Sequence, residues 1–367
     1  MSLKKKPTIA IFTTKWGHES IAQAVAEDLQ GSAKIVVFND APQVANIYTL
    51  LYQYMPSGPK VLGPVMHSQT FSDGVLKYFQ QNYHSSITAF LNQHKPDIII
   101  STYALFGSIL EPYAEQHNVP LLNILADPRT MYSVIISKHA DLNVSFDAAA
   151  SEYVRQLAPG VKVREVGWFV RNDFEQPYDK TAVQNELGLR PDIPVFLIVS
   201  GSEGTTAIMK VLPALLESSS PLQIVVACGN NTVLYKSLTA LQKITDQFSQ
   251  KTLLPLSFTT QLHRYMQAAD LIIGKAGPNT LFEAVATKTP FFAITHLAGQ
   301  EDGNLDIIRE YNLGFVEENP LKARKLLQQL LENPQLHTSL EPNITKMAQY
   351  NARSGEKLRS IVTRLLG

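Results

Sequence analysis

The chain has 367 residues, 45% of them hydrophobic and 17% charged, and its 32 basic and 32 acidic side chains give a formal net charge of zero. This length predicts two domains rather than one ordinary core, and the apolar content excludes a chain that is disordered throughout. The charge balance gives no support to a nucleic-acid partner, because phosphate backbones select basic surfaces.

The basic start MSLKKKP is followed by a short β-branched run and not by the apolar segment of a signal peptide. No stretch approaches the roughly 20 apolar residues that cross a bilayer. The single cysteine, Cys228, rules out a disulfide within the chain and suits a reducing compartment. We therefore expect a cytoplasmic protein that is soluble or peripheral to a membrane.

In chain order, the first half alternates short β-branched runs, which predict strands, with longer segments of helical periodicity. After the first run, Ile21, Val25 and Leu29 fall on one helical face. The runs are apolar throughout, which is typical of parallel strands buried on both faces. Strands are expected at Thr8–Thr14, Lys34–Asp40, Pro96–Tyr103, Pro120–Asp127, Asp141–Asp147 and Val161–Gly167.

One segment breaks this alternation. Residues 42–86 are long for a connection between a strand and a helix, and long connections inside compact domains are usually functional. The segment is rich in Tyr, Leu, Met and Phe, which suits the interface of a bilayer and predicts peripheral membrane contact. The alternative is that these side chains simply cover the edge of the first sheet.

The pattern starts again after a stretch without periodicity, Gly167–Pro194, which we interpret as the linker. Two successive series predict an α/β protein with two Rossmann-like, doubly wound parallel sheets, in domains 1–170 and 171–340. Second-half strands are expected at Pro194–Gly201, Leu222–Gly229, Thr252–Phe258, Leu271–Gly277 and Pro290–His296.

Three polar, glycine-bearing loops follow strands of the second half: Ser200–Thr206, Gly274–Thr280 and His296–Asn304. Because parallel sheets bind ligands at the carboxyl ends of their strands, these loops should line one crevice. Glycine allows close approach to a phosphate, and a helix N-terminus offers N–H groups and partial positive charge. Lys275 adds a charge, and Glu283 is placed to bind a ribose diol. The loops predict a nucleotide or sugar-phosphate site.

The segment KAGPNTLFEAVATKTPFFAITHLAGQEDGN resembles the donor-site signature of a glycosyltransferase family. That family contains the monogalactosyldiacylglycerol synthases and the processive diacylglycerol glucosyltransferases, and is more distantly related to the lipid II N-acetylglucosaminyltransferase. SGSEGTT, ACGNN, TTKWGHESIAQAVAEDL, ADPRT and EVGWFVRNDF resemble further motifs of the family in the same order. The resemblance implies the GT-B architecture, with a donor domain in the second half, an acceptor domain in the first and a cleft between them. It also implies a C-terminal helix, residues 341–367, that crosses back to the first domain.

The resemblance also assigns roles. His18 and Asp127 are the expected catalytic residues, and Trp16 and Gly17 are expected to contact the acceptor. The expected donor-binding residues are, for the diphosphate, Ser202, Glu203, Gly204, Lys275, Gly277, Pro278, Asn279 and Thr280; for the ribose, Glu283; for the base, Phe258 and Thr259; and for the sugar hydroxyls, Gln300, Glu301 and Asn304.

Several of these residues have simpler explanations. The alternative explanation for Glu283 is an exposed charge on a helix, and the alternative for Gly277 is an ordinary glycine in a turn. The alternative explanation for His18 is a helix cap or a packing residue. For Asp127 it is a structural role in a turn, because Asp before Pro is a common turn pair. Relatives carry several glycines before the histidine, whereas this chain has Lys15–Trp16, so the sequence departs from the family pattern in the acceptor half.

The resemblance implies an inverting hexosyltransferase that uses a UDP-sugar as co-substrate and a lipid such as diacylglycerol as acceptor, peripheral at the inner face of the membrane. His18 would take the acceptor's proton. No other cofactor is expected, and the sequence has no Asp-x-Asp pair, His-x-x-x-His pair or cysteine cluster that predicts a metal site. The alternatives are transfer to a soluble or polyprenyl-linked acceptor, or a non-catalytic sugar-nucleotide sensor; an epimerase is a weaker rival.

Overall fold

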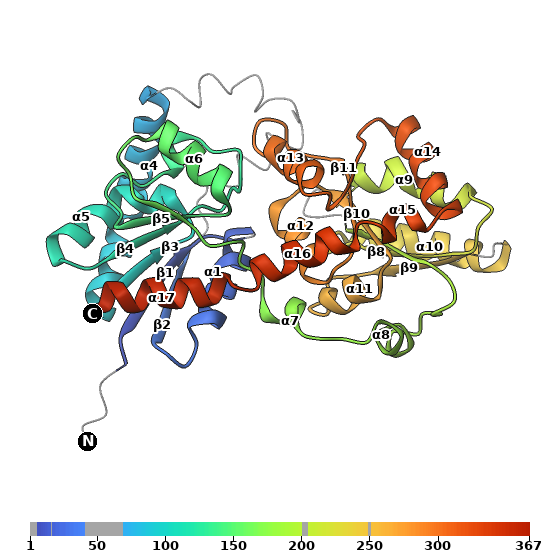
Figure 1. Cartoon of the computed structure of the whole chain (residues 1–367), viewed down its shortest axis with the longest axis horizontal. Helices are drawn as coiled ribbons and strands as arrows, with labels where there is room; N and C mark the ends of the chain where they lie inside the picture. Colours follow the sequence, from blue (N-terminus) through green and yellow to red (C-terminus); the bar gives the residue numbers. More distant parts are fainter. Residues whose placement is uncertain (1–5, 16, 41–68, 200–204, 249–250) are drawn as a thin grey trace. The chain divides into compact units, whose positions relative to one another are not determined.

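The computed structural model describes residues 6–15, 17–40, 69–199, 205–248 and 251–367. The chain folds into two compact units. Unit 1 comprises residues 1–172, 298–300 and 350–367, and unit 2 comprises residues 173–297 and 301–349. Each unit contains a six-stranded parallel sheet flanked by helices (Figure 1), so the predicted α/β class with two doubly wound sheets is confirmed.

The sheet of unit 1 has the strand order β2-β1-β3-β4-β5-β6. Its strands are β1 (Thr8–Thr13), β2 (Lys34–Asn39), β3 (Ile98–Ser101), β4 (Leu121–Ile124), β5 (Leu142–Ser145) and β6 (Val163–Glu165). Its helices are α1 (Gly17–Leu29), α4 (Gln69–His94), η1 (Ala104–Phe106), α5 (Gly107–His117), η2 (Ser133–Ile135) and α6 (Ala148–Leu157). β1 and β3 are buried along their whole length, as their apolar runs predict.

Helix α4 contains much of the segment that was predicted to contact a membrane. Phe79 and Tyr83 lie one turn apart on this helix and pack into the core of unit 1 with Phe12 and Phe106. Their burial favours the alternative explanation, in which this part of the segment covers the sheet. Residues 41–68, with the rest of the segment, lie outside the described residues. Among the residues that the structure describes, no helix combines the length and the apolarity needed to cross a bilayer.

The sheet of unit 2 has the strand order β12-β11-β10-β7-β8-β9. Its strands are β7 (Val195–Val199), β8 (Leu222–Ala227), β9 (Lys251–Leu256), β10 (Leu271–Lys275), β11 (Phe291–Thr295) and β12 (Gly314–Val316). Its helices are α7 (Asn172–Glu175), α8 (Lys180–Glu186), α9 (Thr205–Glu217), α10 (Thr232–Phe248), α11 (Leu262–Ala268), α12 (Pro278–Ala286), α13 (Asp302–Glu310), α14 (Pro320–Glu332), α15 (Gln335–Thr338) and α16 (Glu341–Asn351). Helices α7 and α8 occupy the stretch that the sequence marked as a linker.

In each sheet the order of the strands reverses at one point. The reversal lies between β1 and β3 in unit 1 and between β7 and β10 in unit 2. Loops that leave the carboxyl ends of such neighbouring strands diverge to opposite faces and open a crevice, where ligands of doubly wound sheets bind. The topology therefore selects the loops after β1, β3, β7 and β10 as the places to look for function.

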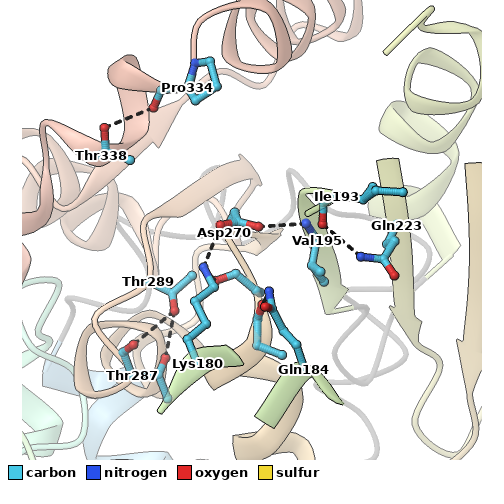
Figure 2. Close-up of polar contacts among 12 residues, drawn as sticks. Lys180, Gln184, Ile193, Val195, Gln223, Asp270, Thr287, Thr289, Pro334 and Thr338 are labelled. Carbon is cyan, nitrogen blue, oxygen red and sulfur yellow. Dashed lines mark hydrogen bonds and ion pairs between the residues drawn. The ribbon is translucent and has the colours of Figure 1, made fainter. Parts of the chain in front are cut away.

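At the opposite edge of the unit 2 sheet, where the strands begin, polar contacts join neighbouring segments (Figure 2). Asp270, just before β10, accepts hydrogen bonds from Lys180 Nζ at 2.6 Å and from the Val195 N–H at 2.8 Å. Gln223 of β8 donates from Nε2 to the Ile193 carbonyl at 2.9 Å. These groups join the starts of three strands, which gives this edge a structural role.

The chain returns to unit 1 at its end. Helix α17 (Ser354–Leu366) packs beside α1, and the Arg359 guanidinium donates to the Asp28 carbonyl at 2.7 Å. The Trp168 N–H donates to Asn351 Oδ1 at 2.9 Å. Gly167 has a φ of 102°, and an added Cβ would lie 3.3 Å from the Asn351 Cα, so glycine is required at this turn. The predicted single helical tail is two helices, α16 and α17.

Candidate active site

The second of the three polar loops joins β10 to α12 at the point where the strand order reverses. Gly274 lies so close to β7 that an added Cβ would sit 3.0 Å from the Val199 carbonyl oxygen. Gly277 is the N-cap of α12 and Pro278 is its first residue. The backbone N–H groups in the first turn of a helix point along its axis toward its N-terminal end, and this end lies at the carboxyl edge of the sheet because α12 follows β10. Gly277 to Thr280 are half-buried, as a phosphate-binding turn requires.

Lys275 and Glu301 form an ion pair across the two predicted donor loops. Lys275 Nζ lies 2.5 Å from Glu301 Oε1, and the Leu297 N–H donates to Glu301 Oε2 at 2.7 Å. The Glu301 side chain is only 6% exposed, whereas that of Lys275 is 24% exposed. Both residues were predicted to contact the donor directly, but in this structure they hold the loops after β10 and β11 together.

Asn304 also joins these two loops. It lies in the first turn of α13, is buried, and donates from Nδ2 to the Ala276 carbonyl at 2.7 Å. Its Oδ1 is buried without a hydrogen-bond partner among the described residues. The structure therefore gives Asn304 a bracing contact beneath the loop, in addition to the sugar-binding role predicted from the sequence. Gln300, in the same loop, is half-buried.

Glu283 and Phe258 differ in their exposure. Glu283 lies on α12 and is buried, so it is not the exposed helix charge of the simpler explanation. Phe258 follows β9 and is 64% exposed, which leaves its ring open to a flat partner such as a base. Thr259 accepts a hydrogen bond on its hydroxyl oxygen from the Gln261 N–H at 3.0 Å, just before α11. The predicted residues Ser202, Glu203, Gly204 and Trp16 lie outside the described residues.

In unit 1, His18 lies at the other reversal of strand order. It belongs to the first turn of α1, after β1, and Gly17 beside it is exposed. His18 Nδ1 lies 2.7 Å from the carbonyl oxygen of Thr102, the residue that follows β3. Its ring meets the Tyr103 ring edge-on, with centroids 4.9 Å apart. His18 follows β1, and its ring contacts two residues that follow β3. A residue that only caps a helix would not make both contacts.

The Thr102 contact fixes the tautomer of His18. A carbonyl oxygen only accepts, so Nδ1 carries the proton and donates, and Nε2 of the neutral ring keeps its lone pair. Burial lowers the pKa of His18 below the ordinary 6.5, while the hydrogen bond to Thr102 raises it by a smaller amount. The lowered pKa keeps the ring neutral near pH 7, the form in which Nε2 accepts a proton. Thr102 is a functional residue that the sequence analysis missed, because its contribution is a backbone carbonyl.

Asp127 lies in the turn after β4 and is half-buried. Two residues later, Arg129 pairs with Asp147 at 2.6 Å, and Asp147 caps α6 by accepting from the Ala150 N–H at 2.7 Å. This ion pair anchors the turn that carries Asp127. The structure thus gives Asp127 a fixed position that is compatible with both the catalytic role and the turn role predicted for it.

His296 was not singled out from the sequence, yet it has two ionic partners. Its Nδ1 lies 2.8 Å from Glu318 Oε1 and its Nε2 lies 2.7 Å from Asp302 Oδ1. It stands at the start of the loop that contains Gln300 and Glu301. The two carboxylates are 22 and 6 residues away in the sequence, so no local pattern reveals this arrangement.

Comparison with known proteins agrees with the predicted family. Residues 195–361 match the glycosyltransferase family 28 C-terminal domain. The chain is 28% identical over 354 residues to a probable monogalactosyldiacylglycerol synthase of Oryza sativa subsp. japonica, covering 88% of this chain and 67% of that protein. It is 24% identical over 364 residues to the processive diacylglycerol β-glucosyltransferase of Bacillus licheniformis, covering 94% and 92%. Other plant synthases are matched over about half their length, 54% for one from Oryza sativa subsp. indica.

Among solved structures, MurG of Acinetobacter baumannii superposes with a TM-score of 0.63 at 18% identity, covering 98% of this chain and all of that one. HepE of Anabaena, solved in complex with UDP-glucose, superposes with a TM-score of 0.56 at 15% identity, covering 96% of this chain. At these identities the similarity concerns the fold. The predicted relationship to the diacylglycerol glycosyltransferases is confirmed, and so is the GT-B fold.

Proposed function

Because residues 195–361 match a glycosyltransferase family 28 C-terminal domain in a chain related to diacylglycerol glycosyltransferases, we propose that this protein transfers a hexose from a UDP-sugar to a lipid acceptor. The acceptor is a lipid alcohol of the diacylglycerol class, and the product is a glycolipid with inverted configuration at the anomeric carbon. The proposal assigns the donor to unit 2 and the activation of the acceptor to unit 1.

The observation that carries the proposal is the position of α12. Its N-terminus stands where the strand order of unit 2 reverses, inside the segment that matches family 28. The N–H groups and the helix dipole there favour a diphosphate in the ground state and stabilise the charge that it gains as it leaves. Glu283, buried later on the same helix, is assigned to the ribose, and the exposed ring of Phe258 to the uracil.

In unit 1, His18 is assigned as the general base. The acceptor hydroxyl oxygen forms a bond to the anomeric carbon while the bond from that carbon to the diphosphate oxygen breaks. The hydroxyl proton moves to His18 Nε2, and the electron pair of the broken bond leaves on UDP. The Thr102 carbonyl supports this transfer, because it bonds Nδ1–H and stabilises the imidazolium that forms.

The test is a matrix of donors and acceptors with the full chain. UDP-glucose and UDP-galactose are each incubated with diacylglycerol in lipid vesicles, and the products are identified by mass. We expect a monohexosyl lipid and free UDP from at least one donor, and a His18→Ala variant that forms roughly 10²–10⁴-fold less product per unit time. Sedimentation with the same vesicles tests peripheral binding to the membrane.

Three outcomes would contradict parts of the proposal. Transfer only to a soluble or polyprenyl-linked alcohol would replace the lipid acceptor. Tight binding of UDP without consumption of any donor would favour a sugar-nucleotide sensor. A nucleotide found away from the α12 N-terminus in a crystal would remove the argument from the helix.

A further inference from the structure

We propose that His296 is a positioning residue for the donor sugar, because it clamps the loop between β11 and α13 by bonding two carboxylates at once. The inference rests on the proposed function, since it concerns the loop assigned to the sugar hydroxyls. It adds a residue that neither the motifs nor the comparisons assign.

The clamp joins three elements of unit 2. His296 follows β11, Asp302 is the first residue of α13, and Glu318 follows β12. The distances are 2.7 Å from Nε2 to Asp302 and 2.8 Å from Nδ1 to Glu318. The His296 side chain is 14% exposed, whereas Asp302 and Glu318 are 51% and 38% exposed. The histidine is therefore the shielded centre of the cluster, and the carboxylates reach it from the solvent side.

Hydrogen-bond chemistry decides the charge state that satisfies this geometry. Ionised carboxylates only accept hydrogen bonds, so both ring nitrogens must donate. A neutral imidazole has one N–H and can satisfy only one of the two carboxylates. The doubly bonded arrangement is thus complete only with the imidazolium, and losing one proton releases one end of the clamp.

The clamp sets the loop that bears the predicted sugar-binding residues. His296 and Asp302 stand at the two ends of this loop, with Gln300 and Glu301 between them. Inside the loop, Glu301 holds the Leu297 N–H and pairs with Lys275. The geometry of the loop is therefore fixed twice, once by Lys275 from the β10 side and once by His296 from the β12 side.

The other charged group near the clamp is Lys210 of α9. Its Nζ donates to the Ile294 carbonyl at 3.1 Å and to the Glu318 carbonyl at 3.4 Å, so it fixes the backbone on which His296 and Glu318 are mounted. Lys210 is bonded to carbonyl oxygens and not to the two carboxylates. Asp302 and Glu318 are the charged groups in contact with His296, and the Lys275–Glu301 pair holds the same loop from the β10 side.

The consequence differs for the two parts of the donor. A loosened loop weakens contacts to the sugar, whereas the uridine and diphosphate are assigned to α12 and Phe258. Affinity for a UDP-sugar should therefore fall when the clamp opens, and affinity for UDP should not. Partly exposed ion pairs are each worth little, so we expect a three- to tenfold effect.

The test measures binding by calorimetry at a single pH. The wild-type protein is compared with His296→Gln, whose side chain is placed to donate to one carboxylate. We expect wild type to bind UDP-glucose or UDP-galactose three- to tenfold more tightly than the variant, with a ratio of affinities near one for UDP.

Two further variants sharpen the result. Glu318→Gln removes one carboxylate from a half-exposed position and should reproduce the loss for the UDP-sugar, which keeps the proposal testable if His296→Gln folds poorly. His139→Gln, an exposed histidine of unit 1, is the matched control and should change nothing. A ratio of one for the UDP-sugar, in a protein that binds donor and transfers sugar, would overturn the clamp alone. Absence of UDP-sugar binding by wild type would overturn the proposed function as well.

Discussion

The ion pair between Lys275 and Glu301 predicts unequal effects of removing its two partners. Replacing Lys275 with Met leaves a carboxylate whose side chain is 6% exposed, which keeps the hydrogen bond from the Leu297 N–H but loses its cationic partner. An uncompensated buried charge costs about 3–5 kcal/mol of the free energy of unfolding. Replacing Glu301 with Gln leaves the Lys275 ammonium, which is 24% exposed and can turn to water, at a cost of about 1 kcal/mol.

The assay is thermal and urea-induced unfolding of the ligand-free protein. For a unit of this size, 1 kcal/mol shifts Tm by about 2–4 °C, so Lys275→Met should lower the Tm of unit 2 by roughly 6–20 °C and Glu301→Gln by roughly 2–4 °C. The double variant should be more stable than Lys275→Met alone, because it buries no unpaired charge. Lys236→Met, an exposed position on α10, is the control and should shift stability by less than about 0.5 kcal/mol. Equal losses from the two single variants, or a double variant that is the least stable, would refute the reasoning.

Three further predictions concern single side chains. The rate of transfer should rise with pH and level off by about pH 7, because the neutral His18 ring is the base and burial holds its pKa below the ordinary 6.5; a rate that instead rises steeply from pH 7 to 9 would implicate another group. Burial raises the pKa of Asp28 to about 6, so its contribution to stability is present at low pH and is lost as the pH rises through 6. Asp28→Asn should therefore stabilise the protein by about 1–3 kcal/mol at pH 8 and by almost nothing at pH 4, as urea midpoints would reveal. Phe258→Ala should weaken UDP binding by about 1–3 kcal/mol in calorimetry, the usual worth of a base stacked on an aromatic ring, without lowering Tm; an unchanged affinity would remove Phe258 from the base site.

The strands were predictable because parallel strands buried on both faces give unbroken apolar runs. The run at Leu271–Gly277 became β10 and the run at Pro194–Gly201 became β7, each within two residues at either end. The positions of the loops after these strands were predictable because each loop comes next in the chain. The order of the strands in the sheet was not predictable, because it depends on which crossover helix packs on which face. This order places the α12 N-terminus at a reversal.

Composition and residue spacing give different predictions for the segment 42–86. Its aromatic content predicted a membrane surface, yet Phe79, Tyr83, Ile87 and Leu91 recur every four residues and form the buried side of α4. This spacing is visible in the sequence and predicts a helix with one buried side. The prediction of a membrane surface gave more weight to the length of the connection. Residues 41–68 lie outside the described part, so membrane contact through them stays a prediction.

The pairings in the candidate site were beyond sequence reasoning for a different reason. Lys275 and Glu301 are 26 residues apart, and His18 and Thr102 are 84 apart. Both pairs exist only because neighbouring parallel strands end at one edge of a sheet. A sequence motif assigns each residue separately to the ligand, whereas in the structure Lys275 and Glu301 are bonded to each other.

This mutual pairing changes the expected source of affinity for the diphosphate. Around the donor loops, the Lys275 ammonium faces a carboxylate, His296 faces two, and Lys210 is bonded to carbonyl oxygens. Among the residues that the structure describes there, the positive charges are thus engaged in holding the loops. The first turn of α12 adds an electropositive feature at the carboxyl edge of the sheet. Its field comes from fixed backbone dipoles that need no reorganisation as a leaving group gains charge, which is the property that stabilises a transition state more than a ground state. Under the proposed function, the side-chain cations keep α12 and the sugar loop in place, and the backbone of α12 acts on the diphosphate itself.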